Sequence, residues 1–240
     1  MSVATAPLLR VDDLHAHYGK SHILRGVTLA VGHHEVVSLL GRNGSGRSTT
    51  LKAIIGLVPP TSGQIRLGDR QLAGAPPHVI CRAGLAFVPE EREVFANLTV
   101  DENLRMGEQV AVPGAYRWSV EQMFDYFPRL KERRNTKGES LSGGEQQMLT
   151  ICRSLLGNPL VILIDEPTEG LAPKVVVQVA DCIRDMHGKG VSVVLVEQKL
   201  AIALKVSTRV CVMGHGRIVF EGSPHELESD RGLLSQWLAV

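Results

Sequence analysis

Apolar residues gather in short runs of strand length, and longer segments of helical character separate these runs. Continuous apolar stretches occupy residues 35–40, 84–88, 160–164 and 191–196. Runs of this length without regular polar alternation are typical of strands that are buried on both faces. Because helical segments alternate with them, the pattern predicts an α/β fold in which helices cover a mostly parallel sheet.

Outside these runs the pattern changes towards both ends of the chain. Residues 8–19 and 26–31 alternate more and predict an antiparallel β subdomain, and residues 209–222 predict a hairpin that turns at Gly214 to Gly216. Residues 58–114 are punctuated by Pro- and Gly-rich pieces that indicate loops. The segment from about 90 to 155 has mainly helical signals and predicts an inserted helical subdomain. Since no internal repeat is present, residues 1–240 are expected to form one domain.

Composition narrows the class of protein. The 240 residues include 26 Lys and Arg and 25 Asp and Glu, mixed along the chain, so a nucleic-acid partner is not expected. No apolar run approaches the ~20 residues of a membrane span, and the amino end does not read as a signal peptide, which favours a soluble, cytoplasmic protein. Four well-separated cysteines are interpreted as reduced packing residues: Cys81, Cys152, Cys182 and Cys211.

A glycine-rich segment directly follows the apolar run at 35–40 and precedes a helical stretch. Its glycines allow backbone N–H groups to surround an anion, and the start of the next helix adds positive potential. The pattern predicts a phosphate-binding loop rather than a simple glycine-rich turn, with Ser48 offering a hydroxyl to Mg²⁺. The candidate nucleotide-binding residues in it are Gly41, Arg42, Asn43, Gly44, Ser45, Gly46, Arg47, Ser48 and Thr49.

Arg47 occupies the position at which such loops normally carry lysine. A lysine ammonium is a compact charge, whereas arginine presents a wide planar fork on a longer stem. We expect nucleotide binding to survive in weakened form, because the backbone groups of the loop are unchanged. Misplacing a catalytic charge by ~1 Å can cost about 100-fold in rate, so the substitution predicts slow hydrolysis.

Two acidic residues, Asp165 and Glu166, follow the apolar run at 160–164. Ligands of open α/β sheets bind at the carboxyl ends of strands. Because successive strand residues point to opposite sides, Asp165 is expected to face Mg²⁺ and Glu166 to face the attacking water. Acids that merely cap the next helix are the alternative, which the upstream phosphate loop disfavours.

The string LSGGEQQML at 141–149 is the most specific in the chain. As a helix start it predicts a capping box between Ser142 and Glu145. That interpretation leaves the paired glycines unexplained. Free N–H groups beside a serine hydroxyl also predict a second anion site, and two phosphate sites in one chain imply that the second serves a neighbouring subunit.

Together these motifs resemble the ATP-binding-cassette (ABC) ATPase subunits over essentially the whole length. The resemblance implies a P-loop NTPase core in which two cassettes sandwich two ATP molecules, with ATP and Mg²⁺ as cofactors. By position, Tyr18 would stack on adenine, Glu166 and Gln198 would act in catalysis, and Ser48, Glu90 and Asp165 would hold Mg²⁺. The residues that would cap the partner's nucleotide are Leu141, Ser142, Gly143, Gly144, Glu145 and Gln146.

Glu90 and Gln198 replace the residues usual in the family, and with "EPTEGLAP" they are similar to the subgroup that powers import of branched-chain amino acids, closely related to urea and short-amide importers. The resemblance implies membrane permease subunits, a sister cassette or a second copy, and indirectly a periplasmic solute-binding protein. The subunit would sit in the cytoplasm on the inner face of the cell membrane.

Several alternatives stay open at this level. The chain is interpreted as a transport ATPase, with a cassette that binds ATP but barely hydrolyses it as the second hypothesis and a soluble cassette acting on DNA or ribosomes as the third. Tyr18 is either an adenine platform or a surface aromatic. His33 and His34 are expected to be solvated, and the terminal segment 232–240 to pack on its own domain or on a partner.

Overall fold

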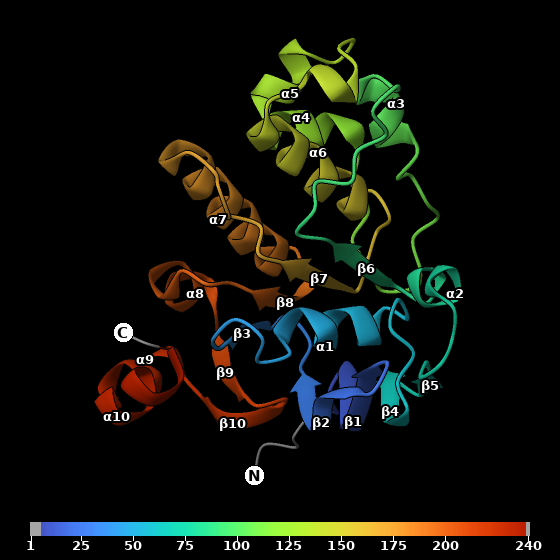
Figure 1. Ribbon diagram of the computed structural model, residues 1–240. Helices are drawn as coiled ribbons and strands as arrows, with labels where there is room; N and C mark the ends of the chain where they lie inside the picture. The colour runs from blue at the N-terminus through green and yellow to red at the C-terminus, as the bar shows by residue number, and fades with distance from the viewer. Residues whose placement is uncertain (1–5, 239–240) are drawn as a thin grey trace.

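The computed structural model describes residues 6–238 and contains two sheets (Figure 1). The larger sheet has six strands in the order β10-β9-β3-β8-β7-β6. All neighbouring pairs in it are parallel except β9 and β10, which form the predicted hairpin. The four apolar runs are confirmed as strands. The bounds are β3 (Val36–Leu40), β6 (Leu85–Val88), β7 (Val161–Asp165), β8 (Ser192–Val196), β9 (Arg209–Gly214) and β10 (Arg217–Gly222).

The smaller sheet is antiparallel, as predicted, but it has more strands than the sequence indicates. Its order is β2-β1-β4-β5, with bounds β1 (Leu9–Tyr18), β2 (Ser21–Val31), β4 (Ser62–Leu67) and β5 (Arg70–Gln71). The Pro- and Gly-rich pieces within 58–114 were predicted as loops and no strand was predicted between them, so β4 and β5 are additional strands, and β4 takes in the last two residues of the first piece. In β4 the inward residues Ile65 and Leu67 are buried against β1, and this tertiary contact outweighs the turn signals around them.

Helices fill the chain between β6 and β7 and lie above the large sheet in Figure 1. They are α3 (Val100–Arg105), α4 (Val120–Tyr126), α5 (Pro128–Glu132), a 3-10 turn (Gly138–Ser140) and α6 (Gly143–Leu155). Thr99, Ser119 and Ser142 begin α3, α4 and α6 with capping boxes, which satisfy the free donors at each start. This helical part thus owes its boundaries to local sequence.

The remaining helices surround the two sheets. They are α1 (Arg47–Ile54), α2 (Pro77–Arg82), α7 (Pro173–Gly188), α8 (Leu200–Val206), α9 (Pro224–Ser229), α10 (Arg231–Leu233) and a last π-helical turn (Leu234–Leu238). The described residues include no helix that is long and apolar enough to cross a membrane.

Side chains from the two faces of the large sheet enter different cores. On β8, Val193 and Leu195 pack with the helical part and α7, whereas Val194 and Val196 pack with α1 and the small sheet. Strand alternation therefore ties the helical part and the antiparallel sheet to opposite faces of one sheet. The carboxyl ends of β3, β7 and β8 come together between these two cores, and each is followed by a motif singled out in the sequence.

Candidate functional site

The glycine-rich loop connects β3 directly to α1. Gly46 is the N-cap of α1 and has a left-handed backbone with φ of 105°. At Gly41 an added Cβ would lie 2.5 Å from the carbonyl oxygen of Met213, so this position has no room for a side chain. Since α1 begins at Arg47, the N–H groups of its first turn have no acceptor within the helix. The loop therefore presents donors to an anion, as the sequence predicts.

Arg47 is buried, and its guanidinium reaches the residues that directly follow β7 and β8. Its side chain is 5% exposed, and its Nη2 lies 3.1 Å from Glu166 Oε1 and 3.2 Å from Asn43 Oδ1. Its Nη1 donates to the backbone oxygen of Glu197 at 3.4 Å. The guanidinium thus binds a carboxylate of its own chain, because the long planar fork reaches past the loop to the strand ends.

Asp165 ends β7 and is fully buried. Ser48 Oγ donates to Asp165 Oδ1 at 2.9 Å, and Asp165 Oδ2 has no hydrogen-bond partner among the described residues. Mg²⁺ prefers carboxylate, hydroxyl and water oxygens. A hydroxyl beside a buried carboxylate oxygen that lacks a partner is a donor set that fits this cation.

Glu166 leaves the strand in a left-handed conformation, with φ of 44°. Its Oε2 accepts from Gln198 Nε2 at 2.5 Å, while its Oε1 faces Arg47. Asp165 and Glu166 do contact different partners, but strand alternation is not the cause, because β7 ends at Asp165 and the backbone turns at Glu166. The left-handed residue aims the second carboxylate across to the loop after β8.

A buried acid that the sequence analysis missed organises that loop. Glu197 is 2% exposed; its Oε1 accepts from the N–H groups of Gln198 and Lys199, and its Oε2 accepts from Thr168 Oγ1 at 2.7 Å. These bonds tie the loop carrying Gln198 to the loop after Glu166. The signal was an acid at the carboxyl end of a buried strand, the same pattern that identified Asp165.

Residues 141–149, the signature segment, form the capping box that their sequence predicts. Ser142 N–H donates to Glu145 Oε2 at 2.8 Å, and Arg133 Nη1 lies 3.1 Å from the same oxygen. Ser142 and Gly144 line a cavity of about 500 Å³ that also includes Arg129 and Lys174. None of the residues lining it belongs to the glycine-rich loop, so it is a separate concave site.

Glu90 lies in a group of carboxylates rather than alone. Ligand oxygens of Glu90, Glu166 and Glu169 all lie within 4.8 Å of one another. Arg92, two residues further on, donates through Nη2 to the backbone oxygen of Glu169 at 3.2 Å. Its guanidinium also packs directly against Gly143, where a Cβ would clash with it. The segment after β6 therefore contacts both the carboxylate site and the signature helix.

Comparison with known proteins agrees with this geometry. The family model described as ABC transporter matches residues 24–169. The chain is 42% identical to the high-affinity branched-chain amino acid transport ATP-binding protein BraG of Pseudomonas aeruginosa, over 88% of this chain and 91% of that protein. It belongs to the ABC transporter ATPase family.

Other relatives of this ABC ATPase serve import in one case and export in another. It is 35% identical to a probable branched-chain amino acid transport ATP-binding protein, LivF, of Archaeoglobus fulgidus, over 92% of this chain and 94% of that protein. It is 34% identical to the lipopolysaccharide export system ATP-binding protein LptB of Acidithiobacillus ferridurans, over 93% of each. A solved cassette, dimeric and bound to ADP and Pi, shares its fold at a TM-score of 0.77 and 24% identity, over 90% of this chain and 98% of that one.

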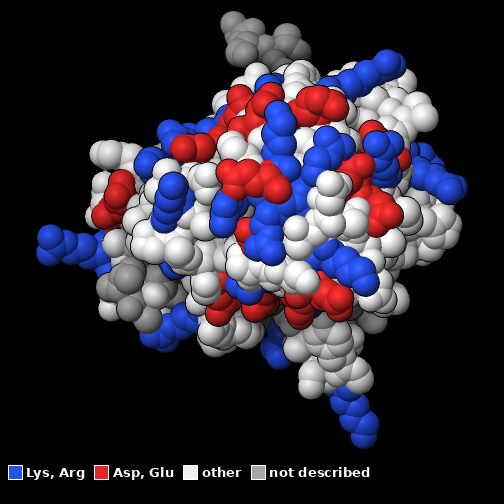
Figure 2. Space-filling view, turned by 90° about the horizontal axis from the view of Figure 1, so that it is seen from above, with Lys and Arg blue, Asp and Glu red and all other residues white. Residues whose placement is uncertain are grey.

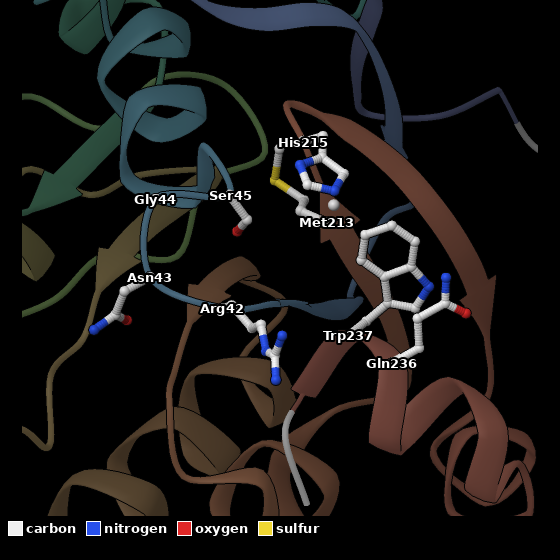
Figure 3. A pocket seen from close by; sticks show the side chains of 9 residues that line it. Arg42, Asn43, Gly44, Ser45, Met213, His215, Gln236 and Trp237 are labelled. Carbon is white, nitrogen blue, oxygen red and sulfur yellow. The ribbon is translucent and has the colours of Figure 1, made fainter.

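The carboxyl end of the ABC ATPase packs on its own domain, as far as it is described. Leu234 and Trp237 pack on the cluster that contains Leu40 and Val212, and the indole of Trp237 covers Gly214. Ala239 and Val240 lie outside the described residues. Trp237 lines a small pocket beside Arg42 and Ser45 of the glycine-rich loop (Figure 3).

Two further expectations concern exposed residues. Tyr18 ends β1 and is 49% exposed, so its ring is accessible to a ligand. His33 and His34 lie in an exposed turn, as predicted.

Seen from above, the face over α3–α6 mixes blue and red side chains (Figure 2), and pairs such as Arg134 with Asp101 explain the mixture. This face carries no uniform basic field of the kind that nucleic-acid binding needs.

The carboxyls of Asp165 and Glu166 hold their protons more tightly than free carboxyls do. Burial raises the pKa of Asp165 to about 6, against the lowering effect of the Ser48 hydrogen bond. Burial, together with a hydrogen bond to Glu169, raises the pKa of Glu166 to about 7, and this outweighs the opposing effect of Arg47. The protein environment therefore favours the neutral form of each acid, as expected where charges lose solvation.

This shift predicts a pH dependence of stability. Because the folded pKa of Glu166 lies above its ordinary 4.5, the folded chain binds the extra proton, and that stabilisation is lost as pH rises from 4.5 to about 7. The Tm of the nucleotide-free chain in EDTA should fall over this range, and Glu166→Gln should flatten the fall. Glu91→Gln, an exposed neighbour, serves as the control; an equal slope in the Glu166→Gln chain would contradict the assignment.

Proposed function

We propose that this ABC ATPase binds and hydrolyses Mg²⁺-ATP to energise import of branched-chain amino acids or related small polar solutes. The observation that carries the proposal is the meeting of four side chains at three strand ends. Ser48 and Asp165 would hold Mg²⁺, Glu166 would act as general base for the attacking water, and Gln198 would orient it. The identity to BraG supports the choice of solute class.

The nucleotide site is proposed to be completed by another cassette. In one chain, Ser142 and Gly144 line a cavity that shares no residue with the glycine-rich loop. A second copy or a sister cassette would place this signature cavity over the phosphates that Gly41–Thr49 hold, with adenine on Tyr18. Two ATP molecules would then join two subunits, and their hydrolysis would separate them.

A permease subunit is proposed to dock beside the helical part, on the cytoplasmic face of the membrane. A groove of about 260 Å³ includes Phe95 and Met106, which are 46% and 61% exposed. Exposed apolar side chains around a concavity are typical of protein contacts. Phe95 lies in the same connection as Glu90, so a segment bound here would sense the carboxylate site.

This docking surface gives a prediction. Met106→Glu should abolish transport in cells while leaving the ATPase rate of the isolated chain within about 2-fold of the parent, because a buried unpaired charge disrupts an interface and nothing else at this site. Val110→Glu, at a 91% exposed position that does not line the groove, is the matched control. Equal transport by the Met106→Glu and Val110→Glu chains would argue against docking here.

A second candidate is a cassette that binds ATP but hydrolyses it slowly and supports a sister ATPase. The ion pair of Arg47 with Glu166 favours it, because the pair occupies the base that hydrolysis needs. Export of lipopolysaccharide is a third, which the similarity to LptB raises. The amino-acid importer is preferred over the exporter because the BraG match is at the higher identity.

Solute uptake distinguishes these functions. Cells that lack the gene would be complemented with the parent chain or with Glu166→Gln, and uptake of labelled leucine and of labelled urea would be measured. The proposal expects leucine uptake with the parent and none with Glu166→Gln. Uptake of urea without uptake of leucine would assign the chain to import of urea and short amides. If cells that lack the gene had a lipopolysaccharide defect and normal leucine uptake, the importer function would be rejected.

A further inference from the structure

Three histidines lie on one face of the β1–β2 hairpin, away from the nucleotide motifs. His15 and His17 are two residues apart on β1, and His22 on β2 is the register partner of His17. All three are half-buried, while the adjacent residues Leu14 and Ala16 are buried in the core. Residues two apart on a strand and their cross-strand partners share a face.

The imidazole nitrogens of two of these residues are already as close as two ligands of one metal ion. His15 Nδ1 lies 3.1 Å from His22 Nε2. Two nitrogens bound tetrahedrally at the Zn–N length of ~2.0–2.1 Å lie about 3.3 Å apart. The ring of His17 stacks on that of His22 with centroids 4.1 Å apart and an angle of 9° between the ring planes, so the His17 ring must turn out of this stack for its nitrogen to bind the same ion.

In both His15 and His17, one ring nitrogen is hydrogen-bonded to a residue outside the three histidines. That bond determines which nitrogen of each ring carries the proton and which keeps its lone pair. His15 Nε2 lies 3.2 Å from Asp13 Oδ1, and since a carboxylate only accepts, this nitrogen carries the proton. Thr61 Oγ1 donates to the backbone oxygen of His15, so it accepts from His17 Nδ1 at 3.2 Å. The lone pairs therefore remain on His15 Nδ1 and His17 Nε2.

We propose that His15, His17 and His22 form a binding site for a late first-row divalent cation such as Zn²⁺. Three neutral imidazoles and a water complete a tetrahedral Zn²⁺ site, and Asp13 supplies the carboxylate that orients a ligand histidine. In the metal-free chain His22 Nε2 donates its proton to His15 Nδ1; for His22 to bind the cation through Nε2 as a neutral imidazole, that proton moves to His22 Nδ1, and no net proton is released. The ion joins β1 to β2 at the turn that presents Tyr18.

Calorimetric titration of the purified, nucleotide-free chain with Zn²⁺ tests the site. We expect one site that His15→Ala and His22→Ala remove and that Asp13→Asn weakens about 10-fold or more. His33→Ala, an exposed histidine in another turn, should bind as the parent does. The Tm of the parent should rise with Zn²⁺ and that of His22→Ala should not, with the metal-free Tm of each variant confirming that it folds.

Co²⁺ absorption then identifies the ligands. Nitrogen ligation without thiolate charge-transfer bands would support the histidines, whereas thiolate bands would assign the metal to cysteines and overturn the proposal. Loss of the site in Glu169→Gln, with full binding by His22→Ala, would place it in the carboxylate group instead. No Zn²⁺ binding by the parent would also reject it. None of these results depends on the transport function.

Discussion

Arg47→Lys is expected to raise steady-state ATP hydrolysis about 100-fold, because a ~1 Å displacement of a catalytic charge costs about that factor. In the structure the guanidinium is 5% exposed and 3.1 Å from Glu166 Oε1. It therefore faces the proposed base Glu166, and its one hydrogen bond to the glycine-rich loop is to the Asn43 side chain. A lysine ammonium is a point charge on an unforked stem, which suits it to the phosphates.

The measurement is the steady-state and single-turnover rate of the purified chain, with ATP affinity determined in parallel. Affinity should change little, since the N–H groups of the loop are the same in both proteins. Arg42→Lys, an exposed arginine of the same loop, controls for a general effect of the exchange. Equal rates for the parent and Arg47→Lys would show that the loop tolerates arginine and that Arg47 leaves Glu166 when nucleotide binds.

The fold was predictable where one local pattern determines it. Unbroken apolar runs identified β3, β6, β7 and β8, and the capping box identified the start of α6. β4 and β5 were missed because both are short and lie among turn residues; β4 becomes a strand by pairing with β1, and β5 by pairing with β4. Tertiary contacts of this kind leave no periodic signal in the sequence.

In the candidate site, the sequence indicated which residues come together but not how they pair. Motif order places Ser48, Asp165 and Gln198 at neighbouring strand ends. The ion pair of Arg47 with Glu166 depends on the length of one side chain, and the orientation of Glu166 depends on its left-handed backbone. Glu197 follows a buried strand as Asp165 ends one, so its position could have been singled out, but its bonds to backbone N–H groups are visible only once the loop is folded.

Glu166→Gln is expected to reduce turnover about 100- to 10,000-fold, the range that a positioned general base contributes. The amide cannot take the proton of the attacking water, yet it can still accept from Gln198, so the loop after β8 should keep its place. ATP binding should persist, and the stalled chain should associate on adding Mg²⁺-ATP. The rate is best compared in the Arg47→Lys background, where the starting activity is higher.

Glu169→Gln distinguishes the loss of the general base from the loss of a negative charge beside it. Glu169 lies in the same carboxylate group as Glu166, so its substitution removes a neighbouring negative charge without removing the base. We expect Glu169→Gln to retain most of the activity. If Glu166→Gln instead hydrolysed ATP within a few-fold of its background, another residue would have to be the base, and the raised pKa of Glu166 would reflect burial alone. A large loss confined to Glu166→Gln would identify the carboxyl that Arg47 holds as the one that activates water, and the slow site would follow from that single ion pair.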